Sequence, residues 1–256
     1  MSPPPDRAAA RRRKSRRQGW VPNQHGAWAM VLTPPVVGAI ESGPTWRHLL
    51  LLVAWLVGYF AFFAAGLWLR SGRKARYVRP VQVYGAATVV LLAALLVASP
   101  GLVAWAPWYA VLLVGSLVAS LRRADRSWFN DTVTVAAACL TAPVAAGLGT
   151  HPPTTAVTWT SAAVLFAYFF GTVVYVKTMI RERGRRSVLV ASVAYHVVVA
   201  VVAWWVHPVL GVVATALAAR AWLVPALRPQ TSPKAVGLGE IAATLAVATA
   251  VLVAVA

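Results

Sequence analysis

The stretch LLLLVAWLVGYFAFFAAGLWL, which runs from Leu49 to Leu69, decides the fold because it contains no charged residue. A helix needs about 20 consecutive apolar residues to cross the hydrocarbon core of a bilayer, and this stretch is long enough. An arginine, Arg70, follows directly. The stretch therefore predicts a transmembrane helix that ends at the membrane surface.

Similar apolar stretches fill the chain of 256 residues, of which 59% are hydrophobic and 12% are charged. Soluble domains carry about 25% charged residues, so this composition excludes a water-soluble globule. A disulfide scaffold is excluded too, because Cys139 is the single cysteine. We therefore predict an all-α polytopic membrane helical bundle with nine transmembrane helices. The predicted spans are His25–Ile40, Leu49–Leu69, Val81–Ser99, Gly101–Leu121, Thr132–Gly149, Thr155–Ile180, Val188–Val206, Val209–Leu227 and Gly237–Ala256.

The basic residues are unevenly distributed between these spans. The chain has 24 lysines and arginines against 6 acids, and all but two of the 24 lie in the N-terminal tail or in the second, fourth, sixth and eighth loops. The exceptions are Arg47, on the other side, and Arg220, inside a span. This distribution follows the positive-inside rule, so we expect a cytoplasmic N-terminus and an external C-terminus in a bacterial cell membrane. It favours membrane lipids rather than nucleic acid as the partner of the positive charge.

The chain divides at the start of the first predicted span. Residues 1–20 contain Pro3-Pro4-Pro5 and an arginine run, which predicts a disordered, basic, cytoplasmic tail. Residues 21–256 are predicted to form a single nine-helix transmembrane domain.

The first span opens with three polar side chains, Asn23, Gln24 and His25. One interpretation is a simple helix cap provided by Asn23. The other is a ligand-binding group at the cytoplasmic mouth of the bundle. Pro34-Pro35 removes two backbone donors within the same span, and a span broken in this way is tolerated where a cavity or another part of the protein satisfies the carbonyls. We therefore expect a cavity beside this helix.

The sixth span ends in a second polar group, which contains Tyr175, Lys177, Arg181 and Glu182. Helical spacing of four predicts that Lys177 and Arg181 share one face. Glu182 is expected to pair with Arg186 or to orient the cations. The alternative is that these cations only extend from the helix end toward the membrane surface.

Five other polar residues in or near the spans are candidates for a structural or functional role. Asn130 and Asp131 precede the fifth predicted span, where a helix cap is the expected role. Glu240 is expected in the first turn of the last helix. His196 and Arg220 lie within spans, where an ionisable residue indicates a functional site unless it only packs or reaches the surface. The histidines lack metal-ligand spacing, so no metal site is predicted.

Three segments resemble the YwiC-like family of bacterial multi-pass membrane proteins. They are Pro22–Met30 with Pro34-Pro35 and Gly38, then Ser127–Asp131, and then Gly171–Gly184. The resemblance extends over roughly residues 20–255. It implies a membrane protein and leaves the activity and any cofactor unknown.

A remoter resemblance is to the UbiA prenyltransferase superfamily, which shares nine spans and long cytoplasmic loops after the second and sixth. Arg79-Pro80 is similar to the end of that superfamily's first Asp-rich motif, but Ala75, Ser71 and Trp68 stand at its carboxylate positions. In the second motif Glu182 alone keeps a carboxylate. Because Mg²⁺ needs several oxygen ligands, metal-assisted departure of a diphosphate is not expected.

Three functions follow from these patterns. The first is binding of an anionic lipid or isoprenoid-type amphiphile in a cytoplasm-facing cavity, with its head near Arg70, Arg73, Lys177 and Arg181. The second is a metal-independent or degenerate UbiA-like prenyl or lipid transferase. The third is a small-molecule transporter, which the two prolines favour but the expected absence of paired intramembrane charges disfavours. The candidate ligand-binding residues are Asn23, Gln24, His25, Arg70, Arg73, Asn130, Asp131, Tyr175, Lys177, Arg181 and Glu182.

Overall fold

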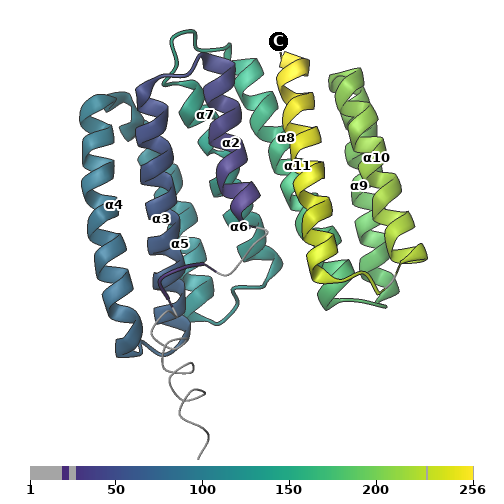
Figure 1. The fold of residues 1–256 in the computed structure, drawn as a ribbon, viewed down its shortest axis with the longest axis horizontal. Coiled ribbons are helices and arrows are strands. Elements are labelled where there is room, and N and C mark those ends of the chain that lie inside the picture. Colours follow the sequence, from purple (N-terminus) through teal and green to yellow (C-terminus); the bar gives the residue numbers. More distant parts are fainter. Residues whose placement is uncertain (1–18, 23–26, 229, 256) are drawn as a thin grey trace, which may run out of the picture. The chain divides into compact units, whose positions relative to one another are not determined.

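A computed structural model describes residues 19–22, 27–228 and 230–255, and these residues form a helical bundle (Figure 1). The predicted all-α class is confirmed. The α-helices are α2 (Ala27–Ser42), α3 (Trp46–Arg70), α4 (Val78–Ala98), α5 (Ala106–Leu121), α6 (Trp128–Cys139), α7 (Thr141–Ala146), α8 (Thr155–Val176), α9 (Arg186–Val206), α10 (Pro208–Leu227) and α11 (Pro233–Val255). The 3₁₀ segments are η1 (Ala75–Tyr77) and η2 (Pro100–Trp105), and η3 (Lys177–Arg181) is a π-helix.

Within the described residues, eight helical segments are long and apolar enough to cross a membrane, counting α6 and α7 as one. They correspond to eight of the nine predicted spans. Trp205 and Val97 are 88% and 84% exposed, as expected for side chains that face lipid rather than protein. The protein is therefore a polytopic membrane protein.

The ninth segment, α2, differs from the prediction at its prolines. The helix runs without interruption through Pro34 and Pro35, both of which are buried, so the expected break is wrong. Neighbouring helices can accommodate proline inside a membrane helix, and α7, α8 and α11 pack against α2. With 16 residues, α2 measures about 24 Å, which is shorter than the hydrocarbon core.

The chain forms two compact units. Of the described residues, unit 1 contains 19–22 and 49–130, and unit 2 contains 27–48, 131–228 and 230–255. Aromatic contacts connect the helices of unit 1: Trp55 in α3 meets Tyr109 in α5 edge-on, and Phe60 in α3 meets Tyr84 in α4 in the same way. The hydroxyl of Tyr84 also donates a 2.8 Å hydrogen bond to the carbonyl of Trp20. The prediction of one domain over residues 21–256 stays a prediction.

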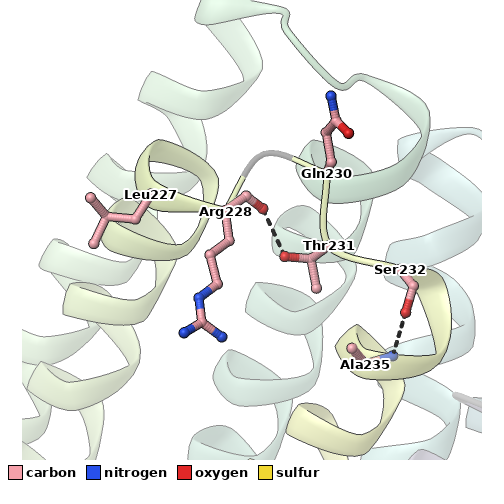
Figure 2. A pocket seen from close by; sticks show the side chains of 6 residues that line it. All are labelled: Leu227, Arg228, Gln230, Thr231, Ser232 and Ala235. Atoms are coloured by element: carbon pink, nitrogen blue, oxygen red, sulfur yellow. Dashed lines mark hydrogen bonds between the residues drawn. The ribbon is translucent and has the colours of Figure 1, made fainter.

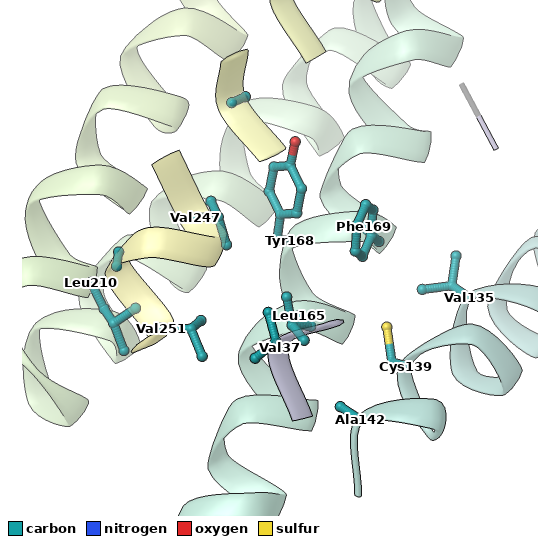
Figure 3. Close-up of a cluster of buried hydrophobic side chains, with 12 residues drawn as sticks. Val37, Val135, Cys139, Ala142, Leu165, Tyr168, Phe169, Leu210, Val247 and Val251 are labelled. Atoms are coloured by element: carbon teal, nitrogen blue, oxygen red, sulfur yellow. The ribbon is translucent and has the colours of Figure 1, made fainter. Parts of the chain in front are cut away.

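Unit 2 has an apolar core to which α2, α6, α7, α8, α10 and α11 contribute (Figure 3). Leu165 and Val135 are fully buried, and Val37 and Val251 are 1% exposed. In Figure 1, α9 and α10 lie side by side as a hairpin, and α11 packs against both α10 and α8.

One close backbone approach and one polar contact join α2 and α3 to α7 inside unit 2. Gly38 lies so close to α7 that a Cβ there would overlap the carbonyl oxygen of Ala142. His48 Nε2 lies 2.9 Å from the carbonyl oxygen of Ala145, and its Nδ1 lies 2.9 Å from the Thr45 backbone nitrogen. Small residues and satisfied polar groups of this kind are typical of helix packing within membranes.

Candidate functional site

A buried ion pair lies between α10 and α11. Arg220 Nη1 lies 2.8 Å from Glu240 Oε1, and the two side chains are 20% and 9% exposed. Each residue lies about two turns, or about 10 Å, from the loop that joins the two helices. The pair is therefore inside the bundle rather than at the end of a helix.

Side chains of α8 surround this pair. Thr172 Oγ1 donates a 2.9 Å hydrogen bond to Glu240 Oε2. The Tyr168 hydroxyl lies 2.8 Å from Thr244 Oγ1, and the guanidinium carbon of Arg220 lies 4.3 Å from the centre of the Tyr175 ring. We call Tyr168, Thr172, Tyr175, Arg220, Glu240 and Thr244 the intramembrane polar cluster.

His196 brings a fourth helix, α9, to this neighbourhood. It is 6% exposed, and its Nδ1 lies 2.7 Å from the carbonyl oxygen of Ser192. The Nε2 atom faces α8 at Gly171, where a Cβ would lie only 3.1 Å away. Arg220 contacts α8 at Tyr175, four positions from Gly171. The intramembrane histidine and arginine predicted from the sequence therefore both lie against α8.

A second ion pair connects α6 with the end of α8. Lys177 Nζ donates a hydrogen bond to Asp131 Oδ2, and the side chains are 10% and 18% exposed. Lys177 begins the π-helix η3, in which Thr178 and Met179 are also buried. Short π segments are rare and occur frequently at functional sites.

The predicted roles of the other sixth-span residues need correction. Arg181 is exposed whereas Lys177 is 8% exposed, so they do not share one environment. The reason is position along the helix: Lys177 is bound to Asp131 inside unit 2, whereas Arg181 is the last residue of the π-helix and lies at its exposed end. Glu182 pairs with Arg185 at 2.6 Å, on an exposed surface, rather than with Arg186.

Asn130 and Asp131 do not cap a helix as predicted. The α6 helix starts earlier, and Ser127 Oγ accepts a 3.2 Å hydrogen bond from the Asn130 backbone N–H. Asn130 is 7% exposed, accepts a 2.6 Å hydrogen bond from Ser116 and donates one to the carbonyl of Asp125. The side chain of Asn130 thus fixes the loop before α6.

Two predicted ligand-binding cations lie in unit 1. Arg70 pairs with Asp125 at 3.6 Å, and Arg73 is exposed with its guanidinium 5.8 Å from the centre of the Trp68 ring. Asn23, Gln24 and His25 lie outside the residues that the structure describes, so their predicted role stays a prediction.

Two further expectations are wrong. Paired intramembrane charges were not expected, but the structure contains Arg220–Glu240 and Asp131–Lys177. Glu240 is not in the first turn of its helix, because α11 starts at Pro233. Proline is favoured at the first position of a helix, where its missing N–H needs no partner.

The Arg220–Glu240 pair could have been predicted from spacing. The two residues lie equally far along the chain from Gln230, in the loop between consecutive spans. An antiparallel hairpin brings such residues to the same depth, where a single acid and a single base in apolar surroundings favour pairing. The Asp131–Lys177 pair has no such signal, because 46 positions separate the two residues.

The loop between α10 and α11 contains an open hollow with a volume of about 550 Å³ (Figure 2). It is lined by Leu227, Arg228, Gln230, Thr231, Ser232 and Ala235. Hydrogen bonds from Thr231 to the Arg228 carbonyl, and from the Ala235 N–H to Ser232 Oγ, hold the loop in shape. Of the predicted ligand-binding residues that the structure describes, none lines this hollow.

Comparison with known proteins decides the family. The family model described as YwiC-like protein matches residues 21–146. The Uncharacterized protein YwiC of Bacillus subtilis (strain 168) is 30% identical over 182 residues, which are 69% of this chain and 73% of the relative. The chain belongs to the YwiC-like family. An Uncharacterized protein of Haemophilus influenzae is 26% identical over 193 residues, which cover 71% of this chain and 76% of that relative.

No solved structure matches the chain. The resemblance to the UbiA superfamily therefore stays a prediction. The YwiC-like family model ends before α8, so Asp131 lies within the matched residues while the intramembrane polar cluster lies after them.

Proposed function

We propose that this YwiC-like protein is a membrane transporter for a small anionic solute, and that the Arg220–Glu240 pair is part of its binding site. The observation that carries the proposal is the location of this pair, buried between α8, α10 and α11. Ionisable residues are costly within a membrane, and they mark substrate or ion pathways.

Stability gives no sufficient reason for such a pair. Removing two charges from water costs several kcal/mol per ion, and well-packed apolar residues of similar volume are often as stable or more so. We therefore infer that the pair has a function in which its two side chains separate. Opening it exposes one cation and one acid at the same depth.

Arg220 has unused capacity to bind an anion. Its Nε is buried and makes no hydrogen bond to the described residues, while Nη1 contacts Glu240. The Tyr175 ring covers the guanidinium at 4.3 Å and fixes its plane. A planar guanidinium with free N–H groups suits a carboxylate, nitrate or phosphate oxygen.

Proton uptake provides a way to exchange partners. When Glu240 binds a proton it becomes neutral and releases Arg220, which then binds the anion, so the site keeps the same net charge. The ionisable groups near Glu240 are Tyr168 and Tyr175 from α8 and Arg220 from α10, and His196 from α9 lies against α8 at Gly171. Within α2, the single ionisable side chain is Glu41, near its C-terminal end, which accepts a 2.6 Å hydrogen bond from Ser161.

A second candidate function is binding of an anionic amphiphile of lipid or isoprenoid type, with its head in a cytoplasm-facing cavity. One observation favours it. Tyr175, which contacts the cation Arg220, is two positions from Lys177, which is itself a buried cation. An anionic head could contact both cations. A metal-dependent transferase is disfavoured, because Asp131 and Glu240 are each bound to a cation of the chain.

The experiment compares anion entry into liposomes that contain the purified protein with entry into empty liposomes. The probes are chloride, nitrate, phosphate, acetate and lactate. Transport predicts entry of at least one probe. It also predicts loss of that entry in Glu240→Gln and partial loss in Thr172→Val, which removes the 2.9 Å hydrogen bond to Glu240 while keeping the ion pair. Arg228→Gln, in the exposed loop of the same hairpin, is the matched control and should transport normally.

Two further measurements separate the other candidates. Amphiphile binding predicts co-purification of an anionic lipid that decreases in Lys177→Met, with no anion entry. Incubation with labelled prenyl diphosphates, with and without Mg²⁺, tests for transfer. Variants that elute as single species in gel filtration are compared, so that loss of folding is not read as loss of function. Entry equal to empty liposomes for all five probes, or normal transport by Glu240→Gln, would contradict the transporter.

A further inference from the structure

Two basic loops meet at one end of unit 1. The first follows α3 and covers residues 71–77, and the second lies between α5 and α6 and covers residues 122–127. Arg70, at the end of α3, pairs with Asp125 of the second loop at 3.6 Å, and Ser120 Oγ donates a 2.7 Å hydrogen bond to the same carboxylate. The two loops are therefore held side by side.

These loops and the start of α4 carry a strong excess of exposed positive charge. Within residues 70–79 and 122–127 the single acid is Asp125, and it is already bound to Arg70. We call the exposed cations of this region the two-loop basic surface. They are Arg73, Lys74, Arg76, Arg79, Arg122, Arg123 and Arg126.

Aromatic side chains accompany the cations. The guanidinium groups of Arg73 and Arg76 lie 5.8 Å and 4.8 Å from the centres of the Trp68 and Tyr77 rings. At the start of α6, Phe129 is 58% exposed, and the neighbouring Trp128 is also exposed. Aromatic rings next to lysine and arginine are typical of the level at which lipid headgroups lie.

Arg123 adopts a backbone conformation that disfavours arginine and favours glycine. Arg123 has φ 56°, and Ala124 N–H donates to the Ala119 carbonyl at 2.7 Å, which closes the end of α5. Glycine is favoured at this left-handed position after a helix, because it has no Cβ. The left-handed backbone therefore gives no reason for an arginine at this position.

We propose that the two-loop basic surface binds the headgroup of an anionic phospholipid, with arginines on the phosphate and the exposed rings of α6 in the hydrocarbon. Guanidinium groups bind phosphate oxygens in a planar, bidentate manner. The adjoining exposed Phe129 favours a lipid over free phosphate, since a dissolved ion gives an apolar ring nothing to contact. This inference concerns unit 1 and does not depend on the proposed transport site.

The test measures binding of a fluorescent phosphatidylglycerol and of a fluorescent phosphatidylcholine to the full-length protein in detergent. We expect phosphatidylglycerol to bind at least about tenfold more tightly, and Arg122→Gln/Arg123→Gln to reduce that affinity by about fivefold per cation. The matched control is Arg228→Gln/Lys234→Gln, which removes two exposed cations from the loop between α10 and α11 and should change the affinity less than about twofold.

Arg123→Gly removes the cation without harm to the backbone, so it should also weaken phosphatidylglycerol binding while the protein stays folded. Inorganic phosphate is added as a competitor and should not displace the lipid. The proposal is overturned if the two lipids bind equally, or if the control weakens binding as much as the paired arginine variant. Displacement by millimolar phosphate would instead identify a site for the free ion and also overturn it.

Discussion

Arg220 Nη1 lies 2.8 Å from Glu240 Oε1, at equal depth in two consecutive membrane helices. The pair is held from a third helix by Thr172 and Tyr175. Because the ion pair that the structure describes for each of these charges is with the other, the two residues should behave as a unit.

Removal of one member of this pair should therefore destabilise the protein more than removal of both. Arg220→Met leaves the Glu240 carboxylate buried without its cation, and Glu240→Gln leaves the Arg220 guanidinium buried without its anion. Each variant is expected to lower the free energy of unfolding by up to about 3–5 kcal/mol. The double variant should lose less than the sum of the two. Unfolding titrations in mixed micelles measure all four proteins, and additive losses would show that the two side chains act independently.

Lys177 and Arg181 should respond differently to the same substitution. Lys177→Met leaves Asp131 without its cation in a site where both side chains are largely buried, so the free energy of unfolding should fall by about 3 kcal/mol. Arg181→Met changes an exposed side chain and should stay within about 0.5 kcal/mol of the parent. The unfolding midpoints of the two variants give the comparison, and equal effects would argue against the buried pair.

Gly38→Ala should destabilise unit 2. The added Cβ overlaps the Ala142 carbonyl oxygen, so α2 and α7 must separate, at an expected cost of about 1–3 kcal/mol. Gly85→Ala in α4 is the control, because a Cβ there meets no atom within 4 Å. Alanine is a better helix former than glycine, so this control should gain up to about 1 kcal/mol. Thermal unfolding followed by circular dichroism distinguishes the opposite signs.

Arg123→Gly should raise the stability of unit 1, in contrast to its expected effect on lipid binding. Arg123 adopts φ 56°, and relief of the left-handed strain is expected to contribute about 1 kcal/mol. Gly72→Ala is the converse variant at the end of α3, where φ is 74°, and it should lose a similar amount. Unfolding midpoints test both, and a loss of stability in Arg123→Gly would contradict the assignment of strain.

Much of the fold could be predicted from hydropathy and charge. Apolar stretches and basic loops indicated the eight long spans, because a helix that crosses the hydrocarbon core must be long enough and apolar enough to do so. The same reasoning failed at Pro34 and Pro35, because whether proline breaks a membrane helix depends on the helices packed around it.

The candidate site could be predicted less completely. Tyr175, Lys177 and Asp131 were found because polar residues stand out in apolar segments, but their partners were not. The Lys177–Asp131 pair depends on how α6 meets α8, and the different exposure of Arg181 depends on where the helix leaves the packed part of the unit, which residue spacing does not predict. Glu240 was assigned to a helix end because Pro233 was not recognised as the start of α11.

The most direct test of the central claim measures proton and anion movement together. Liposomes containing the protein and an internal pH-sensitive dye are exposed to an inward gradient of whichever probe anion the wild-type protein admits. Exchange of partners at Arg220–Glu240 predicts acidification of the interior as the anion enters, and no acidification in Glu240→Gln. Anion entry without acidification, or equal acidification in Glu240→Gln, would contradict the account.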